Sequence, residues 1–102
     1  MPSYQFTQDA LADLLKIRKF TLENWGKEQS KKYLLELSET LELLSGSPSI
    51  GKNRSDISTR TFSFPYASHV IYYKIEKNVL VIFAVLHKSM VPEKHLNHRQ
   101  DQ

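Results

Sequence analysis

The 102-residue sequence contains no cysteine, which excludes disulfide bonds and cysteine-ligated zinc sites. Its longest apolar run, Val79 to Leu86, is far too short to cross a bilayer, so we expect no membrane partner. The stretch from Met1 to Gln5 lacks the basic and apolar segments of a secretory signal, and we expect no signal peptide. These absences favour a cytoplasmic protein, because a chain without cysteine is compatible with a reducing compartment.

The residues that are present describe one small domain. A chain of this length supports a single domain over residues 1–102, with residues 1–90 globular and the polar segment 91–102 a flexible tail. The formal net charge is +3, which favours acidic partners such as nucleic acid or an acidic protein. Because the basic residues are scattered along the chain, an ordinary solvated surface explains that charge equally well.

The first third of the sequence predicts a short strand and then a helix. Ser3 to Thr7 alternates between polar and aromatic residues, and the Thr7 hydroxyl can cap the helix that follows. Gly26 ends this helix, since glycine adopts the left-handed conformation without strain. The residues expected on its apolar face recur at helical spacing and are Ala10, Leu11, Leu14, Leu15 and Ile17.

A second helix is predicted from Lys27 to Ser45, ended by Gly46 and Pro48. Its link to the first helix is short, so we expect an antiparallel pair packed face to face. Trp25 lies at this link and is expected to plug the end of the hairpin. The apolar stripe of the second helix consists of Tyr33, Leu34, Leu37, Leu41 and Leu44.

The second half of the sequence predicts strands. A Ser-, Gly- and Asn-rich loop over residues 47–58 precedes three strands, at Thr59–Phe64, Ser68–Ile75 and Val79–Leu86. Pro65 is expected to end the first of these, and Glu76–Asn78 to form a hairpin turn. Val79–Leu86 is apolar on both faces and is therefore expected in the centre of the sheet. The pattern predicts an α+β fold in which two helices pack on a mainly antiparallel sheet of about four strands.

Four motifs occur in a recognisable order between Tyr4 and Met90. The motifs are Trp25-Gly26-x-x-Gln29 with Tyr33, Pro48-x-x-Gly51-x-x-Arg54, His69-Val70-Ile71-Tyr72-Tyr73, and Leu86-His87-x-x-Met90. In these motifs the chain resembles the ParE-type toxins of the ParE/RelE toxin–antitoxin superfamily, whose fold has the same order of elements.

The resemblance implies a plasmid-stabilisation type of toxin that binds DNA gyrase and is neutralised by a cognate, ParD-like antitoxin. It implies no enzymatic activity, no cofactor and no sequence-specific binding of nucleic acid. Candidates for target contact follow the last strand and are His87, Lys88, Met90, Lys94 and His95. Candidates for contact with an acidic antitoxin are the basic residues of the two helices: Lys16, Arg18, Lys19, Lys27, Lys31 and Lys32.

The sequence departs from the family pattern at three positions. Many relatives resemble one another in carrying arginine where this chain has Phe62 and Ala84, and an acidic residue where it has Val91. If those charges help to hold the gyrase-facing surface, toxicity is weakened or lost. The chain would then be a degenerate family member that only binds an antitoxin.

The RelE-like ribosome-dependent mRNA endoribonucleases share this scaffold and supply an alternative. RNA cleavage needs an acid, a base and cations around the scissile phosphate. The candidate catalytic residues here are His87, Lys88 and Arg54. Lys52 and Arg60, close to Arg54 in the sequence, are further candidate cations. This alternative is disfavoured because no tyrosine follows the final strand and two positions that are usually basic are apolar.

The histidines suggest a metal site only weakly. His87, His95 and His98 lack compact ligand spacing and a companion carboxylate pair, so we expect no metal. His69 is expected to hydrogen-bond a neighbouring carbonyl or side chain, with Tyr72 and Tyr73 offering nearby packing and hydroxyl partners.

Overall fold

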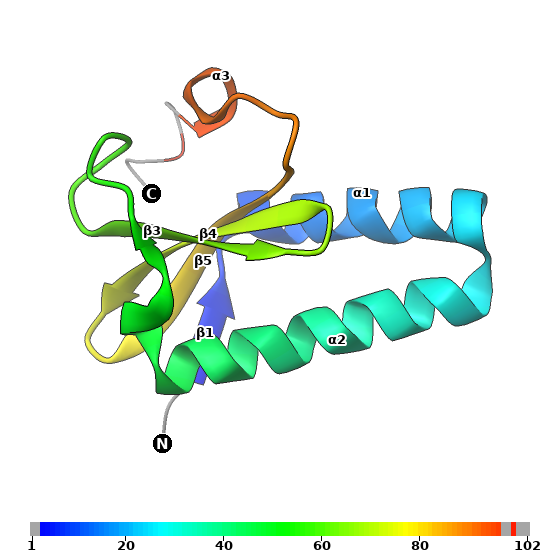
Figure 1. Cartoon of the computed structure of the whole chain (residues 1–102), viewed down its shortest axis with the longest axis horizontal. Helices are drawn as coiled ribbons and strands as arrows, with labels where there is room; N and C mark the ends of the chain where they lie inside the picture. Colours follow the sequence, from blue (N-terminus) through cyan, green and yellow to red (C-terminus); the bar gives the residue numbers. More distant parts are fainter. Residues whose placement is uncertain (1–2, 97–98, 100–102) are drawn as a thin grey trace.

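The computed structural model describes residues 3–96 and Arg99. A hairpin of two long helices covers one face of a single sheet, and a short helix lies against the other face (Figure 1). None of the described helices is long and apolar enough to span a membrane. The elements are β1 (Ser3–Phe6), α1 (Gln8–Trp25), α2 (Lys27–Gly46), the 3-10 turn η1 (Pro48–Ile50), β2 (Lys52–Asn53), β3 (Thr61–Tyr66), β4 (His69–Glu76), β5 (Val79–His87) and α3 (Pro92–Leu96).

The helical hairpin begins and turns at the predicted residues. The amide of Ala10 donates to the Thr7 hydroxyl over 3.2 Å, which confirms the predicted cap. Gly26 separates α1 from α2 with φ at 90°, a backbone conformation that other residues rarely adopt. A buried hydrogen bond of 2.7 Å between the hydroxyls of Thr21 and Ser30 then joins the two helices close to their turn.

The buried face of α2 agrees with the sequence prediction, whereas the buried face of α1 differs from it. On α2, Tyr33, Leu37, Leu41 and Leu44 are buried as predicted. On α1, the prediction for Leu11 and Leu15 is wrong, since their side chains are 47% and 67% exposed. The narrow face that α1 turns inward consists of Ala10, Asp13, Ile17 and Thr21.

The α+β prediction is confirmed, and the sheet has five strands in the order β1-β5-β4-β3-β2. β5 lies in the interior of the sheet between antiparallel β4 and parallel β1, but the middle strand is β4 and not β5 as predicted. The additional strand is β2, a pair of residues within the segment that was predicted to be a loop. A strand of two residues has no periodicity by which the sequence could reveal it.

Two details of the predicted strands are wrong. β3 continues through Pro65, which is paired with Val70 of β4. β2 pairs only with Phe62 and Ser63, so the outer edge of β3 has no strand partner at Pro65. No hydrogen bond of the sheet is lost there through the missing amide proton of proline. The β4–β5 turn consists of two residues, Lys77 and Asn78, both with positive φ, as in the turns that match the twist of a hairpin.

The segment expected to be a flexible tail contains a short helix in its described part. α3 spans Pro92–Leu96, and Leu96 is fully buried. It completes a small second core on the face of the sheet opposite the helical hairpin, with Tyr72, Phe83, Ala84 and Leu86. The sequence did not predict this helix because five polar-rich residues do not establish a helical period. Within this segment, residues 97, 98 and 100–102, which include His98, lie outside the described residues.

Replacing Gly51 with alanine should destabilise the fold. A Cβ at this position would lie 1.9 Å from the Tyr73 hydroxyl oxygen, and the Tyr73 ring is fully buried. That hydroxyl also donates to the Pro48 carbonyl over 2.7 Å, so the ring cannot move freely. We expect Gly51→Ala to lower the free energy of unfolding by about 1–3 kcal/mol in urea titrations.

Gly46→Ala is the matched control for this substitution. A Cβ there meets no atom within 4 Å. Because alanine also favours a helix over glycine, this variant should be as stable as the wild type or more stable, by up to about 1 kcal/mol. Equal stability of the two variants would contradict the close packing of Tyr73 on Gly51.

Candidate functional site

The end of β5 displays the residues that were expected to contact a target. His87 is followed by a tight turn in which the Met90 amide donates to the His87 carbonyl over 2.9 Å. The Lys88 amide donates to the Ser68 carbonyl over 2.8 Å, and Ser89 hydrogen-bonds His87 Nδ1 through its amide and its hydroxyl. The segment from His87 to Met90 is thus fixed by its backbone while Lys88 and Met90 remain exposed.

Two hollows flank Met90. The first, the sheet-face hollow, has a volume of about 520 Å³ and is lined by Lys52, Arg54, Tyr72 and Lys88 among others. The second, the edge hollow, has a volume of about 420 Å³ and lies between α1, the end of β5 and the C-terminal segment. Its lining includes Lys16, Ile17, Phe20, His69, His87, Met90, His95 and Arg99.

Four of the five predicted target-contact residues line these hollows. His87 and His95 line the edge hollow, Lys88 lines the sheet-face hollow, and Met90 lines both. Lys94 is exposed and lines neither. Sequence reasoning missed the contribution of α1, since Phe20 is 53% exposed beside His87 and Met90 in the edge hollow.

The three residues of the RNase alternative are not assembled around one point. Arg54 and Lys88 line the sheet-face hollow, whereas His87 lines the edge hollow and is bonded to Ser89. The Arg54 guanidinium forms two hydrogen bonds with the Asp56 carboxylate, of 3.1 and 3.0 Å. These bonds raise the pKa of Arg54 and lower the pKa of Asp56, so much of the cation's charge is already paired.

His69 is buried at the start of β4, with 8% of its surface exposed. His69 is hydrogen-bonded to a side chain as predicted, but the partner is neither Tyr72 nor Tyr73: the Tyr33 hydroxyl from α2 lies 2.6 Å from His69 Nδ1. The His69 ring also meets the His87 ring edge to face, with centroids 5.6 Å apart. Burial lowers the pKa of His69, and the neighbouring His87 adds to that effect.

An aromatic chain links this histidine to the turn of the helical hairpin. The Trp25 ring contacts the rings of Phe20 and Tyr33 edge to face, at 6.0 and 5.5 Å. The Tyr66 hydroxyl donates to the Tyr33 carbonyl over 2.6 Å, and burial raises the pKa of Tyr66 to about 12. Trp25 remains 43% exposed, so it packs on the end of the hairpin without being enclosed by it.

A third hollow, the helix groove, lies between α1, α2 and β1 and has a volume of about 350 Å³. Of the six basic residues expected to contact an antitoxin, only Arg18 lines it; Lys19, Lys27, Lys31 and Lys32 are exposed on the helices, and Lys16 lines the edge hollow. The surplus of leucines on α1 is the sequence signal for this groove. Its lining is Tyr4, Phe6, Leu11, Leu14, Leu15, Arg18, Leu34, Leu37, Ser38 and Leu41.

Two of the three positions that depart from the family pattern, Phe62 and Ala84, have structural roles here. Phe62 stacks on Tyr73, with ring centroids 5.7 Å apart. Ala84 is fully buried in the second core with Leu96, so an arginine there would displace α3. Val91 is 45% exposed and lines neither hollow beside Met90. Among the described residues, no group of three histidine or acidic side chains is arranged to hold a metal ion.

The free energy of unfolding should fall as the pH falls below 6.5, because of His69. The folded state holds this imidazole neutral by burial, whereas the unfolded chain takes up a proton near the ordinary histidine pKa of 6.5. Acid therefore favours the unfolded state. Urea titrations at pH 7.5 and pH 5.5 should show this loss in the wild type and a smaller loss in His69→Gln.

Tyr33→Phe serves as the control for this prediction. Because burial is the main cause of the shift in the pKa of His69, the variant without the tyrosine hydroxyl should keep the pH dependence of the wild type. An unchanged pH dependence in His69→Gln would show that another group is responsible.

Comparison with known proteins identifies relatives by sequence and, separately, structures of similar fold. A family model described as "ParE toxin of type II toxin-antitoxin system, parDE" matches residues 4–92. Toxin ParE1 of Caulobacter vibrioides is 32% identical over 94% of this chain and 99% of its own length. Toxin ParE1 of Mycobacterium tuberculosis is 27% identical over 91% of this chain and 96% of its own length.

Two solved structures have a similar fold. The chromosomal ParDE system from P. aeruginosa has a TM-score of 0.72 at 18% identity, covering 85% of this chain and 96% of that one. The toxin–antitoxin complex RelBE2 from Mycobacterium tuberculosis has a TM-score of 0.63 at 24% identity, covering 86% and 100%. Since the sequence match extends from β1 into α3 and the fold agrees with it, this chain belongs to the ParE toxin family of type II toxin–antitoxin systems.

Proposed function

We propose that this chain inhibits DNA gyrase by direct binding, through the end of β5 and the two hollows beside it, in the cytoplasm. Membership of the ParE family supports a toxin role. The observation that carries the choice of surface is the fixed turn from His87 to Met90, which presents Lys88 and Met90 to solvent between two hollows. A rigid, basic, partly apolar projection is suited to protein recognition, because little conformational freedom is lost on binding.

Binding is favoured over RNA cleavage by the separation of the potential catalytic groups. A general acid or base must reach the reacting phosphate together with the cations that stabilise it. His87 lines the edge hollow, whereas Lys88 and Arg54 line the sheet-face hollow, and Arg54 is hydrogen-bonded to Asp56. This arrangement supports a mechanism in which these residues serve as contacts.

The wild-type chain should inhibit ATP-dependent supercoiling of relaxed plasmid by purified gyrase. Lys88→Glu should raise the half-inhibitory concentration by about tenfold, because it reverses a charge at the centre of the proposed surface. Lys77→Glu makes the same change at the exposed β4–β5 turn, away from both hollows, and should inhibit like the wild type.

A parallel reaction with ribosomes and mRNA decides between the candidate functions. Intact mRNA with lost supercoiling supports the proposal. Cut mRNA with normal supercoiling would establish the RNase alternative. No effect in either reaction would identify a degenerate toxin, with Phe62 and Ala84 in place of the arginines of its relatives.

We further propose that the helix groove binds the apolar face of an amphipathic helix from a cognate antitoxin. The two structures of similar fold are titled as toxin–antitoxin systems, which supports a partner of this class. The groove is almost wholly apolar and is lined by Leu11 and Leu15, whose exposure is unfavourable without a partner. Arg18 in the lining and Lys19 nearby on α1 suit an acidic antitoxin segment.

Leu15→Glu should weaken antitoxin binding by about tenfold or more, because it places a charge in an apolar contact. Leu15 is 67% exposed, so the substitution should leave the fold intact. Leu35→Glu is the matched control, since Leu35 is 59% exposed on α2 and does not line the groove. Isothermal titration with the co-expressed antitoxin or its C-terminal peptide measures both variants, and equal affinities would place the antitoxin elsewhere.

A further inference from the structure

The edge of β5 that faces β1 has a strand partner along only half of its length. β1 pairs with β5 only from Val79 to Ile82, and its last contact is the Thr7 amide donating to the Ile82 carbonyl over 3.0 Å. Beyond Ile82, β5 is paired on the β4 side alone. Backbone groups on the open side are buried under α1 and the C-terminal segment, so they need partners other than a strand.

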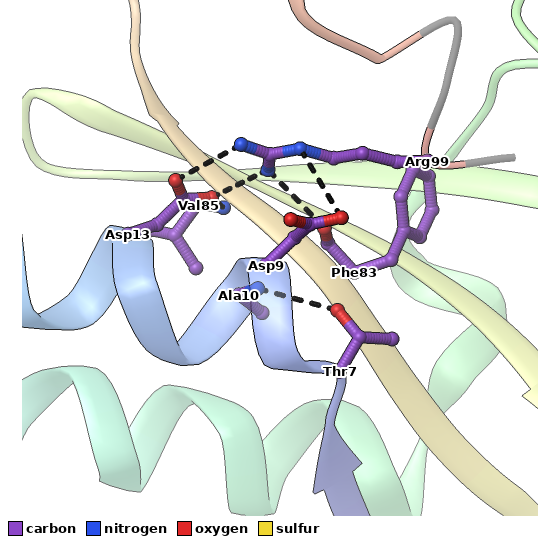
Figure 2. A network of polar contacts seen from close by, with 7 residues as sticks. All are labelled: Thr7, Asp9, Ala10, Asp13, Phe83, Val85 and Arg99. Carbon is purple, nitrogen blue, oxygen red and sulfur yellow. Dashed lines mark hydrogen bonds and ion pairs between the residues drawn. The ribbon is translucent and has the colours of Figure 1, made fainter. Parts of the chain in front are cut away.

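Two charged side chains supply those partners (Figure 2). The Val85 amide donates to Asp13 Oδ2 over 3.0 Å, and Arg99 Nη1 donates to the Phe83 carbonyl over 3.3 Å. The same two side chains bind each other, with Arg99 Nη1 2.7 Å from Asp13 Oδ2 and Nη2 3.2 Å from Oδ1. Arg99 Nε also lies 3.9 Å from the carboxylate of Asp9. The pair takes the place of the missing strand.

The pair is buried, which makes the two side chains depend on each other. The side chain of Asp13 is 6% exposed and that of Arg99 is 12% exposed. Removing one member leaves the other as an uncompensated charge and leaves a backbone group of β5 unpaired. A planar guanidinium satisfies both carboxylate oxygens and the carbonyl together, which a lysine ammonium cannot match.

This contact spans the edge hollow. Lys16, Ile17 and Phe20 of α1 form one wall of that hollow, and Met90, His95 and Arg99 of the C-terminal segment form the other. Asp13 belongs to the first wall, so the Asp13–Arg99 pair ties the two walls together. Leu96, the buried end of α3, is the other described anchor of this segment in the sheet.

We propose that Arg99 is a positioning residue of the gyrase-binding surface: its bond to Asp13 holds the C-terminal segment against α1 and so places Met90 and His95 beside His87. The proposal rests on the proposed function for its target, and on the geometry of the pair for its mechanism. Arg99 acts through these residues and need not touch gyrase itself.

The test compares Arg99→Gln, Arg99→Lys and the wild type, with Arg60→Gln as the control. Arg60 is exposed between β2 and β3 and lines neither hollow beside Met90, so its substitution makes the same charge change elsewhere. Amide hydrogen exchange of the free chain reports whether α3 and the Val85 amide remain protected. The supercoiling assay reports the half-inhibitory concentration, and antitoxin affinity at the helix groove reports that the variant is folded.

We expect Arg99→Gln to speed exchange across α3 and at Val85, and to raise the half-inhibitory concentration about tenfold or more. Antitoxin affinity should stay within about twofold of the wild type, since the groove lies on the other side of α1. Arg99→Lys should recover part of the potency, because it keeps the charge but not the paired hydrogen bonds. Arg60→Gln should match the wild type throughout.

Two outcomes overturn the proposal while leaving the proposed function in place. Unchanged exchange in Arg99→Gln would show that Arg99 does not hold the segment. Faster exchange with undiminished gyrase inhibition would show that the held segment does not form the surface. A wild type that does not inhibit gyrase would overturn the proposed function and, with it, the positioning role, while the exchange measurement would still decide whether the pair holds α3.

Discussion

β5 is hydrogen-bonded along both edges for only the first half of its length, and the rest of the structure accommodates that asymmetry. β1 ends opposite Ile82, so the Val85 amide and the Phe83 carbonyl face α1 and the C-terminal segment instead of a strand. An unpaired backbone group in a buried position is costly. Asp13 accepts a hydrogen bond from the Val85 amide, and Arg99 donates one to the Phe83 carbonyl. These bonds fix both α1 and the C-terminal segment against this edge of β5.

The same contact shapes the surface that we propose for target binding. Since α1 and the C-terminal segment meet at the Asp13–Arg99 pair, the turn from His87 to Met90 projects between them with a hollow on either side. The helix groove lies on the other side of α1 and has an apolar lining. One helix thus separates the surface proposed for the target from the surface proposed for the antitoxin. An antitoxin bound in the groove need not cover the end of β5 unless its chain continues around the molecule.

The sequence predicted what local periodicity encodes. The break at Gly26, the buried stripe of α2 and the interior position of β5 follow from spacing and from turn residues. It did not reveal that Asp13 is buried. An acidic residue near the start of a helix is explained by the helix dipole alone. The available sign was its position on the same helical face as Ala10 and Ile17, which indicates a buried side chain that needs a partner. Its partner Arg99 is 86 residues away, a separation over which no local pattern operates. The bond between Tyr33 and His69 was missed for the same reason.

The measurement that tests the account most directly is amide hydrogen exchange of the wild-type chain with and without purified gyrase. If the end of β5 and the walls of the edge hollow bind gyrase, protection should rise from His87 to Leu96 and around Phe20 on α1. The helix groove around Leu11 and the β4–β5 turn should be unaffected. Protection confined to the groove, or no change anywhere in the presence of gyrase, would contradict the proposal that the end of β5 and the edge hollow bind gyrase.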